Sequence, residues 1–504
     1  MSGNVNHKER LSRATLAQAP TSVTTPAYDP AQTRIGIVHI GVGAFHRAHQ
    51  AAYVDNLLSE HPDWAICGVS LHSVEVRDAL QPQDGLYSLL LLGQETQLRV
   101  IGSIRELLCA REQQADVLAR LADPAVRLVT LTITEKGYCL SGDDLDVAHT
   151  DIAHDLASPN TPRSAIGYVT AGLRMRRQLG SAPFTVLSCD NLAGNGHRLR
   201  AAVLQYAQRI DAALATWIEA HVAFPCSMVD SITPASDDAL RERVHAQLGY
   251  LDVWPIQRET YTQWVIENRF CNDRPPFERV GATMSDDIAG YDRAKLRLLN
   301  GAHSTLAYLG SLMNIETVVD AMSEPLLARF VERLMRDAIA PAIALPADMD
   351  ADAYIDAILK RFRNPTIRHR LSQIAWDGSQ KLPVRLLSTI ADALALDLPI
   401  RTLCISIAAW MHFVRRQAHA GVALIDPLNE ELSTVGRACK GGTAADVEAF
   451  LKLTAVFALL ADDRRFTHAL QDAYLALGDG TPASIARALA VANNASPTPL
   501  PSNG

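Results

Sequence analysis

The stretch Thr33-Arg-Ile-Gly-Ile-Val-His-Ile40-Gly41-Val-Gly43-Ala-Phe-His46-Arg47 decides the fold. Its first half is apolar and rich in β-branched residues, which predicts a buried strand. The strand runs into a Gly-x-Gly turn, and residues 50–58 continue with helical periodicity. This order is typical of dinucleotide binding, because the first glycine permits a tight turn and the second lets a pyrophosphate approach the backbone. An ordinary strand–turn–helix connection is the alternative.

The turn departs from the dinucleotide pattern at one position. His46 stands where a third small residue is usual. We therefore expect the helix to stand slightly away from the strand, with the Arg47 side chain available to a phosphate. The residues of the turn predicted to bind the cofactor are Gly41, Val42, Gly43, Ala44, Phe45, His46 and Arg47.

The end of the second predicted strand, residues 64–71, bears on cofactor choice. An acidic residue at this point usually binds the ribose 2′-hydroxyl of NAD. Here Ser70 occupies the strand end, the first acid is Glu75, and Arg77 lies nearby. We expect Ser70 to contact the cofactor, which is taken to be NAD with NADP left open.

The pattern of strands and helices predicts two domains. Strands at 86–92, 98–104, 126–134 and 184–189 alternate with helices near 103–122, 164–179 and 196–209. This alternation predicts an α/β domain with a Rossmann-type, parallel, doubly wound sheet. From residue 291 onward the periodicity is almost entirely helical. We expect a dinucleotide-binding domain at 31–290 and a mostly α-helical domain at 291–495, flanked by flexible segments at 1–30 and 496–504.

Composition excludes several classes of protein. The chain has 504 residues and a formal net charge of −8, with both signs mixed, so there is no basic footprint for nucleic acid. No apolar run is long enough or uninterrupted enough to span a bilayer. The polar N-terminal stretch, residues 1–30, has no apolar core of the kind that a secretory signal contains. The eight cysteines form no CxxC pair, which argues against a zinc site and a disulfide framework. We expect a cytoplasmic monomer or weak oligomer with a small-molecule ligand.

Residues 291–309 form a helix that carries three polar groups. Leucines recur there at helical spacing, and at about 100° per residue Lys295 lies at about 0°, His303 at about 80° and Asn300 at about 140°. The amine, imidazole and amide therefore share one face. Such a set could take a proton from an alcohol and stabilise the oxyanion that remains. A solvated polar stripe is the alternative reading.

Polar residues also follow three of the predicted strands. Thr134 and Glu135 follow the strand at 126–134, Asn191 follows 184–189, and Asp230 ends the strand at 224–230. In open α/β sheets, ligands bind outside the carboxyl ends of the strands. We therefore expect these residues to contact the cofactor or substrate, although turn and helix-cap roles explain the same pattern.

The combined motifs resemble the polyol-specific long-chain dehydrogenases, the mannitol dehydrogenase family. The resemblance extends from about residue 33 to 490. The segments that carry it are Gly41-Val-Gly-Ala-Phe-His-Arg-Ala-His-Gln50, Thr134-Glu-Lys-Gly-Tyr138, Ser188-Cys-Asp-Asn191, Phe224-Pro-Cys-Ser-Met-Val-Asp230 and Lys295-x4-Asn300-x2-His303. One departure is Ser231, where the family pattern has arginine.

The resemblance implies a metal-independent oxidoreductase that uses a nicotinamide cofactor. Lys295 would be the general acid and base, and burial would disfavour its charged form. Asn191 and Asn300 would polarise the substrate oxygen. His303 and Lys381 would position the substrate, and Asp230 would hold its hydroxyl groups.

Within the family, four segments resemble enzymes that interconvert D-fructuronate and D-mannonate. They are residues 134–139, 162–168, 364–370 and 377–383. A uronate needs a cation for its carboxylate, ideally an arginine. The candidates are Arg368, Arg370, Lys381 and Arg385, the last two in a predicted loop at 376–385. Oxidation of D-mannitol or a related pentitol is the alternative, and nucleotide binding without catalysis is a more remote one.

Overall fold

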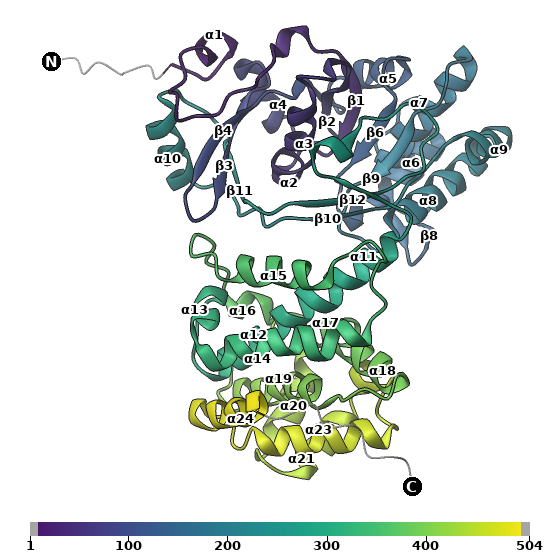
Figure 1. The fold of residues 1–504 in the computed structure, drawn as a ribbon. Helices are drawn as coiled ribbons and strands as arrows, with labels where there is room; N and C mark the ends of the chain where they lie inside the picture. Colours follow the sequence, from purple (N-terminus) through teal and green to yellow (C-terminus); the bar gives the residue numbers. More distant parts are fainter. Residues whose placement is uncertain (1–8, 495–504) are drawn as a thin grey trace. The chain divides into compact units, whose positions relative to one another are not determined.

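The computed structural model describes residues 9–494, which divide by their contacts into two units (Figure 1). The first unit is Met1–Ala289 and the second is Gly290–Gly504. The expected flexibility of residues 1–8 and 495–504 lies outside the described residues.

The first unit is built on a five-stranded parallel sheet with the order β5-β2-β1-β6-β9. Counted along the chain, this is the order 3-2-1-4-5 of a Rossmann-type sheet, so the predicted fold class is confirmed. The direction of winding reverses between β1 and β6, which is where such sheets bind ligands. The strands are β1 (Ile35–Ile40), β2 (Ala65–Ser70), β5 (Ile104–Cys109), β6 (Leu128–Leu131) and β9 (Thr185–Ser188).

Helices cover both faces of this sheet, because side chains of each strand alternate between two cores. Val38 and Ile40 of β1 belong to one core, and Ile37 belongs to the other. The first core includes residues of α5 (Gln114–Ala122), α7 (Ala165–Leu179), α8 (Asn195–Ile210) and α9 (Ala212–His221). The second core includes residues of α3 (Gln50–Leu57) and α4 (Glu75–Leu80).

The prediction for residues 86–109 is partly wrong. The strands β3 (Tyr87–Leu92) and β4 (Gln97–Ile101) leave the parallel sheet and pair antiparallel with each other. A distant strand, β11 (Ile256–Glu259), pairs with β3 to complete a second sheet. Residues 104–109 form β5 rather than the start of a helix, because their apolar side chains pack against β2 at the sheet edge.

A further sheet and several short elements complete the first unit. The strands β10 (Ser227–Asp230), β12 (Gln263–Glu267) and β13 (Thr283–Ser285) form the sheet order β10-β12-β13. The remaining elements are α1 (Arg13–Leu16), α2 (Ala44–Ala48), β7 (Leu140–Ser141), β8 (Asp144–Leu145), α6 (Thr150–Ala157) and α10 (Asp238–Leu248).

The expected flexible segment at 1–30 is wrong for residues 9–30. Leu11 is fully buried and its backbone N–H donates to the carbonyl of Leu251 at 3.0 Å. Thr24 pairs with β4: its backbone N–H donates to the carbonyl of Leu98, and its carbonyl accepts from the backbone N–H of Val100. These main-chain bonds and the burial of an apolar side chain compensate the entropy of ordering a polar, proline-rich stretch.

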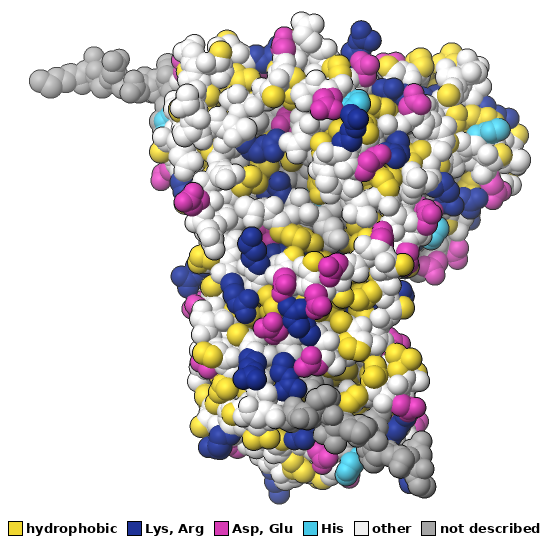
Figure 2. Space-filling model, in the orientation of Figure 1, with side chains coloured by type: hydrophobic (Ala, Val, Ile, Leu, Met, Phe, Trp, Pro, Cys, Tyr) yellow, Lys and Arg dark blue, Asp and Glu magenta, His cyan; other side chains and the backbone are white. Residues whose placement is uncertain are grey.

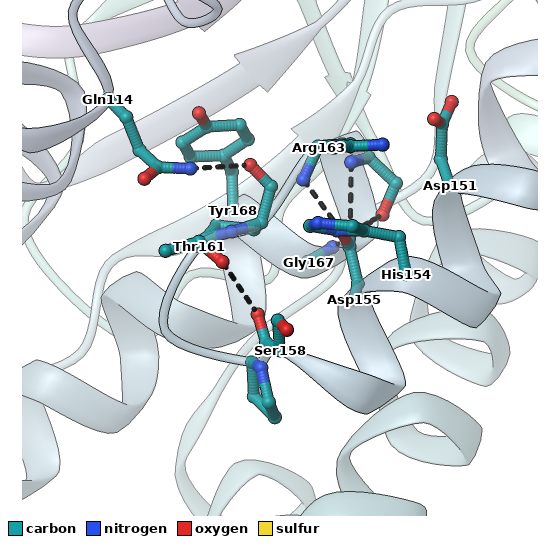
Figure 3. Close-up of polar contacts among 12 residues, drawn as sticks. Gln114, Asp151, His154, Asp155, Ser158, Thr161, Arg163, Gly167 and Tyr168 are labelled. Carbon is teal, nitrogen blue, oxygen red and sulfur yellow. Dashed lines mark hydrogen bonds and ion pairs between the residues drawn. The ribbon is translucent and has the colours of Figure 1, made fainter.

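Asp155 organises the start of α7 (Figure 3). Its buried carboxylate accepts hydrogen bonds from the backbone N–H of Arg163 at 2.7 Å and of Ser164 at 2.9 Å. A Cβ on Gly167 would lie 2.2 Å from an oxygen of Asp155, so only glycine fits there. Residues 162–168 carry part of the family resemblance. Their role in the structure is therefore to form the hydrogen-bonded start of α7, a helix that packs on the sheet.

The second unit is helical, as predicted, and α12 lies at its centre. Every residue of α12 from Gly301 to Gly310 is buried. The elements are α11 (Ile288–Ala294), η6 (Lys295–Leu299), α12 (Asn300–Leu312), α13 (Val318–Ser323), α14 (Pro325–Arg333), η7 (Leu334–Ile339), α15 (Ala351–Phe362), α16 (Leu371–Ile374), α17 (Gly378–Leu382), η9 (Pro383–Leu387), α18 (Ser388–Ala395), α19 (Arg401–His419), α20 (Asn429–Ala438), α21 (Ala444–Leu451), α22 (Thr454–Phe457), α23 (Arg464–Ala476) and α24 (Pro482–Asn494).

Two predictions within this unit need correction. The almost entirely helical pattern expected after residue 291 is interrupted before α16, because the chain from 364 to 370 is held by contacts with the start of α13. The predicted loop at 376–385 is largely helical, since Asp426 accepts from the backbone N–H and hydroxyl of Ser379 and anchors the start of α17. Lys381 and Arg385 are therefore presented from α17 and from η9.

Three π-helices interrupt the described part of the helical unit, residues 290–494: η6, η7 and η9. A π-helix has hydrogen bonds from residue i to i+5, is rare, and is frequent at functional sites. Of these, η6 begins at the predicted catalytic lysine and η9 contains Arg385. The two segments η6 and η9 contact each other.

The visible surface carries mixed charge. Figure 2 shows basic and acidic side chains interspersed, without a broad field of one sign. Ion pairs account for part of this pattern, such as those of Arg336 with Asp352 and Asp356.

Within residues 9–494, no helix combines the length and apolar character needed to cross a membrane. All eight cysteines are free.

A buried arginine connects the elements at the amino-terminal edge of the parallel sheet. Arg176 of α7 is fully buried and donates to four backbone carbonyls, including Leu121 at 2.8 Å and Ala182 at 2.8 Å. Its guanidinium lies over the ring of Phe184, 4.9 Å from the centroid. The side chain thus ties α5, the start of β6 and the connection to β9 together.

Replacing this arginine tests its contribution. Arg176→Met should lower the free energy of unfolding by about 3 kcal/mol, because four buried or partly buried carbonyls lose their donor. Arg177→Met, which removes only a partly exposed ion pair with Asp211, should change it by less than about 0.5 kcal/mol. Urea unfolding followed by circular dichroism measures both; equal midpoints for the two variants would contradict this role.

Candidate active site

The glycine turn after β1 has the shape expected of a dinucleotide cradle. Gly41 has φ +102°, and a Cβ there would lie 2.1 Å from the carbonyl oxygen of Thr132, so this position requires glycine. Gly43 is different, because a Cβ there would meet no protein atom closer than the Gly41 oxygen at 4.0 Å. The protein itself does not require glycine at 43. The open space fits the close approach of a pyrophosphate.

His39 holds the carbonyl of the first glycine. Its Nε2 lies 2.9 Å from Thr132 Oγ1 and 3.1 Å from the Gly41 oxygen, and its Nδ1 lies 2.7 Å from Thr130 Oγ1. Thr132 donates its hydroxyl proton to the Gly41 oxygen at 2.7 Å, so the proton of His39 belongs on Nε2. The turn is thereby tied to β6 at the switch point of the sheet.

His46 packs against this histidine. The two imidazole rings are stacked with centroids 3.3 Å apart, and both side chains are buried. Burial lowers the pKa of His39 to about 3 and lowers the pKa of His46 well below its ordinary value. Both rings are therefore neutral at physiological pH. The imidazole of His46 thus occupies the space next to β1 in which the usual dinucleotide pattern has a small residue.

The expectation that the Arg47 side chain is available to a phosphate is wrong. Arg47 is 1% exposed and donates to the carbonyl of Trp254 at 2.8 Å. Its guanidinium lies over the rings of Tyr87 and Trp254, with centroid distances of 5.5 and 5.4 Å. Aromatic faces and a carbonyl stabilise the buried cation, so the side chain joins α2 to the second sheet. Any phosphate contact from Arg47 must come from its backbone.

Asp190 holds the loop after β6 in a strained conformation. Thr134 has φ 61° and ψ 166°, a region that is essentially restricted to glycine. The Asp190 carboxylate accepts from the backbone N–H of Ile133 at 3.1 Å and of Thr134 at 2.8 Å. The Tyr138 hydroxyl adds a third hydrogen bond at 2.8 Å. Asp190 was not among the predicted site residues, although it belongs to a segment quoted for the family resemblance.

The other predicted residues of the first unit lie where strands end. Thr134, Glu135 and Asn191 are exposed beyond β6 and β9, and Ser70 is half-buried at the end of β2. All four thus lie at the carboxyl edge of the parallel sheet, together with the glycine turn. Asp230, at the end of β10, is 7% exposed.

Lys295 and Asn300 are brought together by η6. The backbone N–H of Asn300 donates to the carbonyl of Lys295, an i to i+5 bond. The prediction of a continuous α-helix, with the two residues about 140° apart, is therefore wrong. One wide turn places Asn300 directly after Lys295 on the same face of the helix. Both side chains are half-buried.

His303 lies one turn further, in a basic setting. Its ring is 4.5 Å from Phe362 and 5.6 Å from His369, measured between centroids. Burial lowers the pKa of His303 well below its ordinary value, and His369, Arg361 and Arg385 lower it further. His303 is therefore a neutral hydrogen-bonding group. Arg361 and His369 were not among the predicted site residues, although His369 belongs to a segment quoted for the resemblance.

Asp292 is the acidic neighbour of the lysine. It precedes Lys295 by three residues, and burial raises the pKa of its carboxyl to about 6 while Lys295 opposes the rise. The carboxyl thus titrates close to neutral pH in the folded chain.

The predicted cations for a substrate carboxylate have different surroundings. Arg370 is largely exposed, with Glu316 3.9 Å away. Lys381 donates to the carbonyl of Trp376 at 2.6 Å and lies 3.7 Å from Asp377. Arg385 donates to Ser304 Oγ at 3.1 Å, and no carboxylate of the described chain lies within ion-pair distance of it. Arg368 is exposed. No group of three or more potential metal ligands occurs within residues 9–494.

These two units have the organisation of a dinucleotide-dependent oxidoreductase: a Rossmann-type unit with a glycine turn, then a helical unit with a lysine, an amide and an imidazole on one face. Family models agree. The mannitol dehydrogenase Rossmann domain matches residues 35–279, and the mannitol dehydrogenase C-terminal domain matches residues 287–478. The chain belongs to the mannitol dehydrogenase family, whose members are NAD-dependent oxidoreductases acting on CH–OH groups.

Individual relatives have two different substrates in their names. The chain is 41% identical to the D-mannonate oxidoreductase of Escherichia coli (strain K12) over 454 residues, which cover 88% of this chain and 93% of that protein. It is 39% identical to the mannitol 2-dehydrogenase of Neosartorya fischeri over 458 residues, covering 88% and 90%. The structure of Pseudomonas fluorescens mannitol 2-dehydrogenase with NAD and D-mannitol has TM-score 0.76 and 36% identity, covering 96% of this chain and 99% of that chain.

The role of Asp190 can be tested through the cofactor. Asp190→Asn should raise the Kd of NADH by about 10- to 100-fold, because the amide offers an N–H where the loop needs an acceptor. Fluorescence titration with NADH measures this. Asp143→Asn, an exposed position, is the matched control.

A second substitution separates strain from folding. In the Asp190→Asn background, Thr134→Gly should recover part of the lost affinity, because glycine adopts this conformation without being held. An unchanged Kd in Asp190→Asn would show that this loop is not part of the cofactor site.

The titration of Asp292 predicts a pH dependence of stability. Its folded pKa of about 6 lies above the ordinary 3.8, so the ionised form is disfavoured by folding, and stability is lost as pH rises from about 4 through about 6. Asp292→Asn removes this loss. The thermal midpoint of the variant relative to the parent should therefore increase between about pH 4.5 and about pH 7.5. A constant or falling difference would contradict the raised pKa.

Proposed function

We propose that this chain is a NAD(H)-dependent reductase that interconverts D-fructuronate and D-mannonate. The observation that carries the reaction type is the π-turn that stacks Asn300 on Lys295, with neutral His303 one turn further. The open cradle at Gly43 supports nicotinamide dinucleotide binding. The 41% identity with a D-mannonate oxidoreductase supports the substrate.

The proposed roles follow from the chemistry of each group. A bound nicotinamide supplies or accepts the hydride. In the reduction, Lys295 as ammonium gives a proton to the carbonyl oxygen while hydride adds to the carbon; in the oxidation, its amine takes the hydroxyl proton. The Asn300 and Asn191 amides are proposed to donate hydrogen bonds to that oxygen and stabilise its developing charge. Neutral His303 orients the substrate hydroxyls.

Substrate positioning is assigned to several polar side chains. Asp230 is proposed to accept hydrogen bonds from hydroxyl groups, as a carboxylate does. Lys381 and Arg370 remain candidates for contact with the substrate, although in the structure they contact Trp376 and Glu316. Arg385 is the candidate whose surroundings supply no carboxylate within residues 9–494.

The surroundings of Ser70 favour NAD over NADP. A 2′-phosphate needs a cation near the end of β2, and Arg77 is the nearby candidate. Its guanidinium already contacts Asp78 and Glu112, each at 2.9 Å. Two carboxylates on this arginine would oppose a phosphate, whereas the small Ser70 leaves room for a ribose hydroxyl. NAD is therefore the proposed cofactor.

Oxidation of D-mannitol to D-fructose is the second candidate. It is supported by the 39% identity with a mannitol 2-dehydrogenase and by the likeness to the complex with NAD and D-mannitol. Nucleotide binding without catalysis is a third possibility in another class. The intact set of Lys295, Asn300 and His303 argues against it.

A substrate panel separates these candidates. Nicotinamide absorbance would be followed with D-fructuronate and D-fructose in the reducing direction, and with D-mannonate, D-mannitol and D-arabinitol in the oxidising direction. NADH and NADPH would be compared in parallel. Turnover of fructose with none of fructuronate would reject the uronate proposal, and cofactor binding with no turnover would support the third reading.

Replacing the lysine tests the mechanism. Lys295→Ala should lower kcat by about 10²- to 10⁴-fold, the usual contribution of a positioned acid–base group. The Kd of NADH should stay within about threefold, because the glycine turn and strand ends are unaltered. Steady-state rates and fluorescence titration measure the two effects. Parent-like turnover in the variant would show that another group transfers the proton.

A further inference from the structure

The ionisable side chains that act on His303 are all of one type. After burial, the groups that lower the pKa of His303 are His369, Arg361 and Arg385, all of them basic. A neutral polyol offers no charge to balance such a setting. A substrate with a carboxylate would balance it, because opposite charges attract strongly where water is excluded.

Arg385 is a half-buried cation without a counter-ion in the described part of the chain. It belongs to η9, and burial lowers the pKa of its guanidinium. Its Nη1 donates to Ser304 Oγ at 3.1 Å and weakly to the Asn300 carbonyl at 3.5 Å. No acidic side chain in the described part of the chain forms an ion pair with it. A guanidinium has five N–H donors, so donors remain for a planar, bidentate anion.

His369 supplies a second donor next to the same turn of α12. Its ring meets the ring of His303 nearly edge-on, at 78° between planes. Its backbone carbonyl accepts from Val318 at 3.0 Å, which fixes the segment that carries it. Its Nδ1 is buried and has no hydrogen-bond partner within residues 9–494. A buried polar atom without a partner is costly, and a ligand oxygen would satisfy it.

The other cations near this region are already engaged or exposed. Lys381 is held by its own helix start through Trp376 and Asp377. The Arg370 side chain is 64% exposed beside Glu316. Neither combines burial with a missing partner. By contrast, Arg385 is half-buried and has no counter-ion, and His369 is half-buried with a buried Nδ1 that has no partner within residues 9–494. These two side chains contact consecutive residues of α12, Ser304 and His303.

We propose that Arg385 and His369 together bind the carboxylate of a sugar-acid substrate, with Arg385 as the main, bidentate ligand. This deepens the proposed function and rests on it. Lys295 and Asn300 act on the reacting carbon, and Arg385 and His369 hold the opposite end of the sugar chain. The pair would therefore determine specificity for an acid over a polyol ending in a hydroxymethyl group.

Binding measurements test this without turnover. D-mannonate and, separately, D-mannitol would be titrated by calorimetry into the full-length enzyme saturated with NADH, in which neither alcohol can be oxidised. Arg385→Met should weaken D-mannonate binding by about 10- to 100-fold, and His369→Asn by about 3- to 10-fold. D-mannitol binding should change by less than about threefold in both. Arg385→Lys should recover only part of the loss, because an ammonium cannot bind bidentately. Arg363→Met, at an exposed position after α15, is the control and should match the parent.

The outcomes separate the two proposals. Equal weakening of D-mannonate and D-mannitol in Arg385→Met would mean a structural role and overturn the inference. Failure of the parent enzyme to bind D-mannonate would overturn it as well. If the parent binds D-mannonate through these residues but does not oxidise it with NAD, the proposed function fails and the binding site stands. If the parent oxidises D-mannonate and the variants bind it normally, the function stands and the assigned ligands are wrong.

Discussion

One hydrogen bond determines how the proposed catalytic residues of the helical unit are arranged: the i to i+5 bond from the Asn300 N–H to the Lys295 carbonyl. With α-helical hydrogen bonding, the side chains of Lys295 and Asn300 would point in different directions. The wider turn stacks them, and the burial of α12 on all sides keeps the turn from relaxing. Another π-helix, η9, packs against η6 and brings Arg385 to the same stretch of α12.

The nucleotide unit follows a comparable rule, in which buried polar groups fix backbone that would otherwise be mobile. His39 restrains the carbonyl of Gly41, and Asp190 restrains the loop at Thr134. Both act from within the sheet upon loops at its carboxyl edge. A rigid scaffold that positions exposed loops is the common arrangement of ligand sites in open α/β folds.

Sequence reasoning reached the parallel sheet, the glycine turn and the lysine helix because each depends on local periodicity. It placed β3 and β4 in the wrong sheet, since their partner β11 lies far along the chain and strand pairing leaves no local mark. It made Arg47 a phosphate ligand, because the rings of Tyr87 and Trp254 that enclose it are also distant in sequence. The π-turn was missed because helical spacing does not show where an extra residue is accommodated. Asp190 and His369 were in quoted segments, but their partners emerge only in three dimensions.

The stacked histidines of the glycine turn make the nucleotide unit sensitive to acid. Both rings are neutral in the fold, with the pKa of His39 near 3, whereas an unfolded histidine takes up a proton below about pH 6.5. Stability is therefore lost as pH falls through that value, and the loss continues toward pH 3. Proton uptake by this pair would break the stack and release Gly41. Low pH would thus disrupt the conformation of the glycine turn through two buried histidines, independently of any group that carries out the reaction.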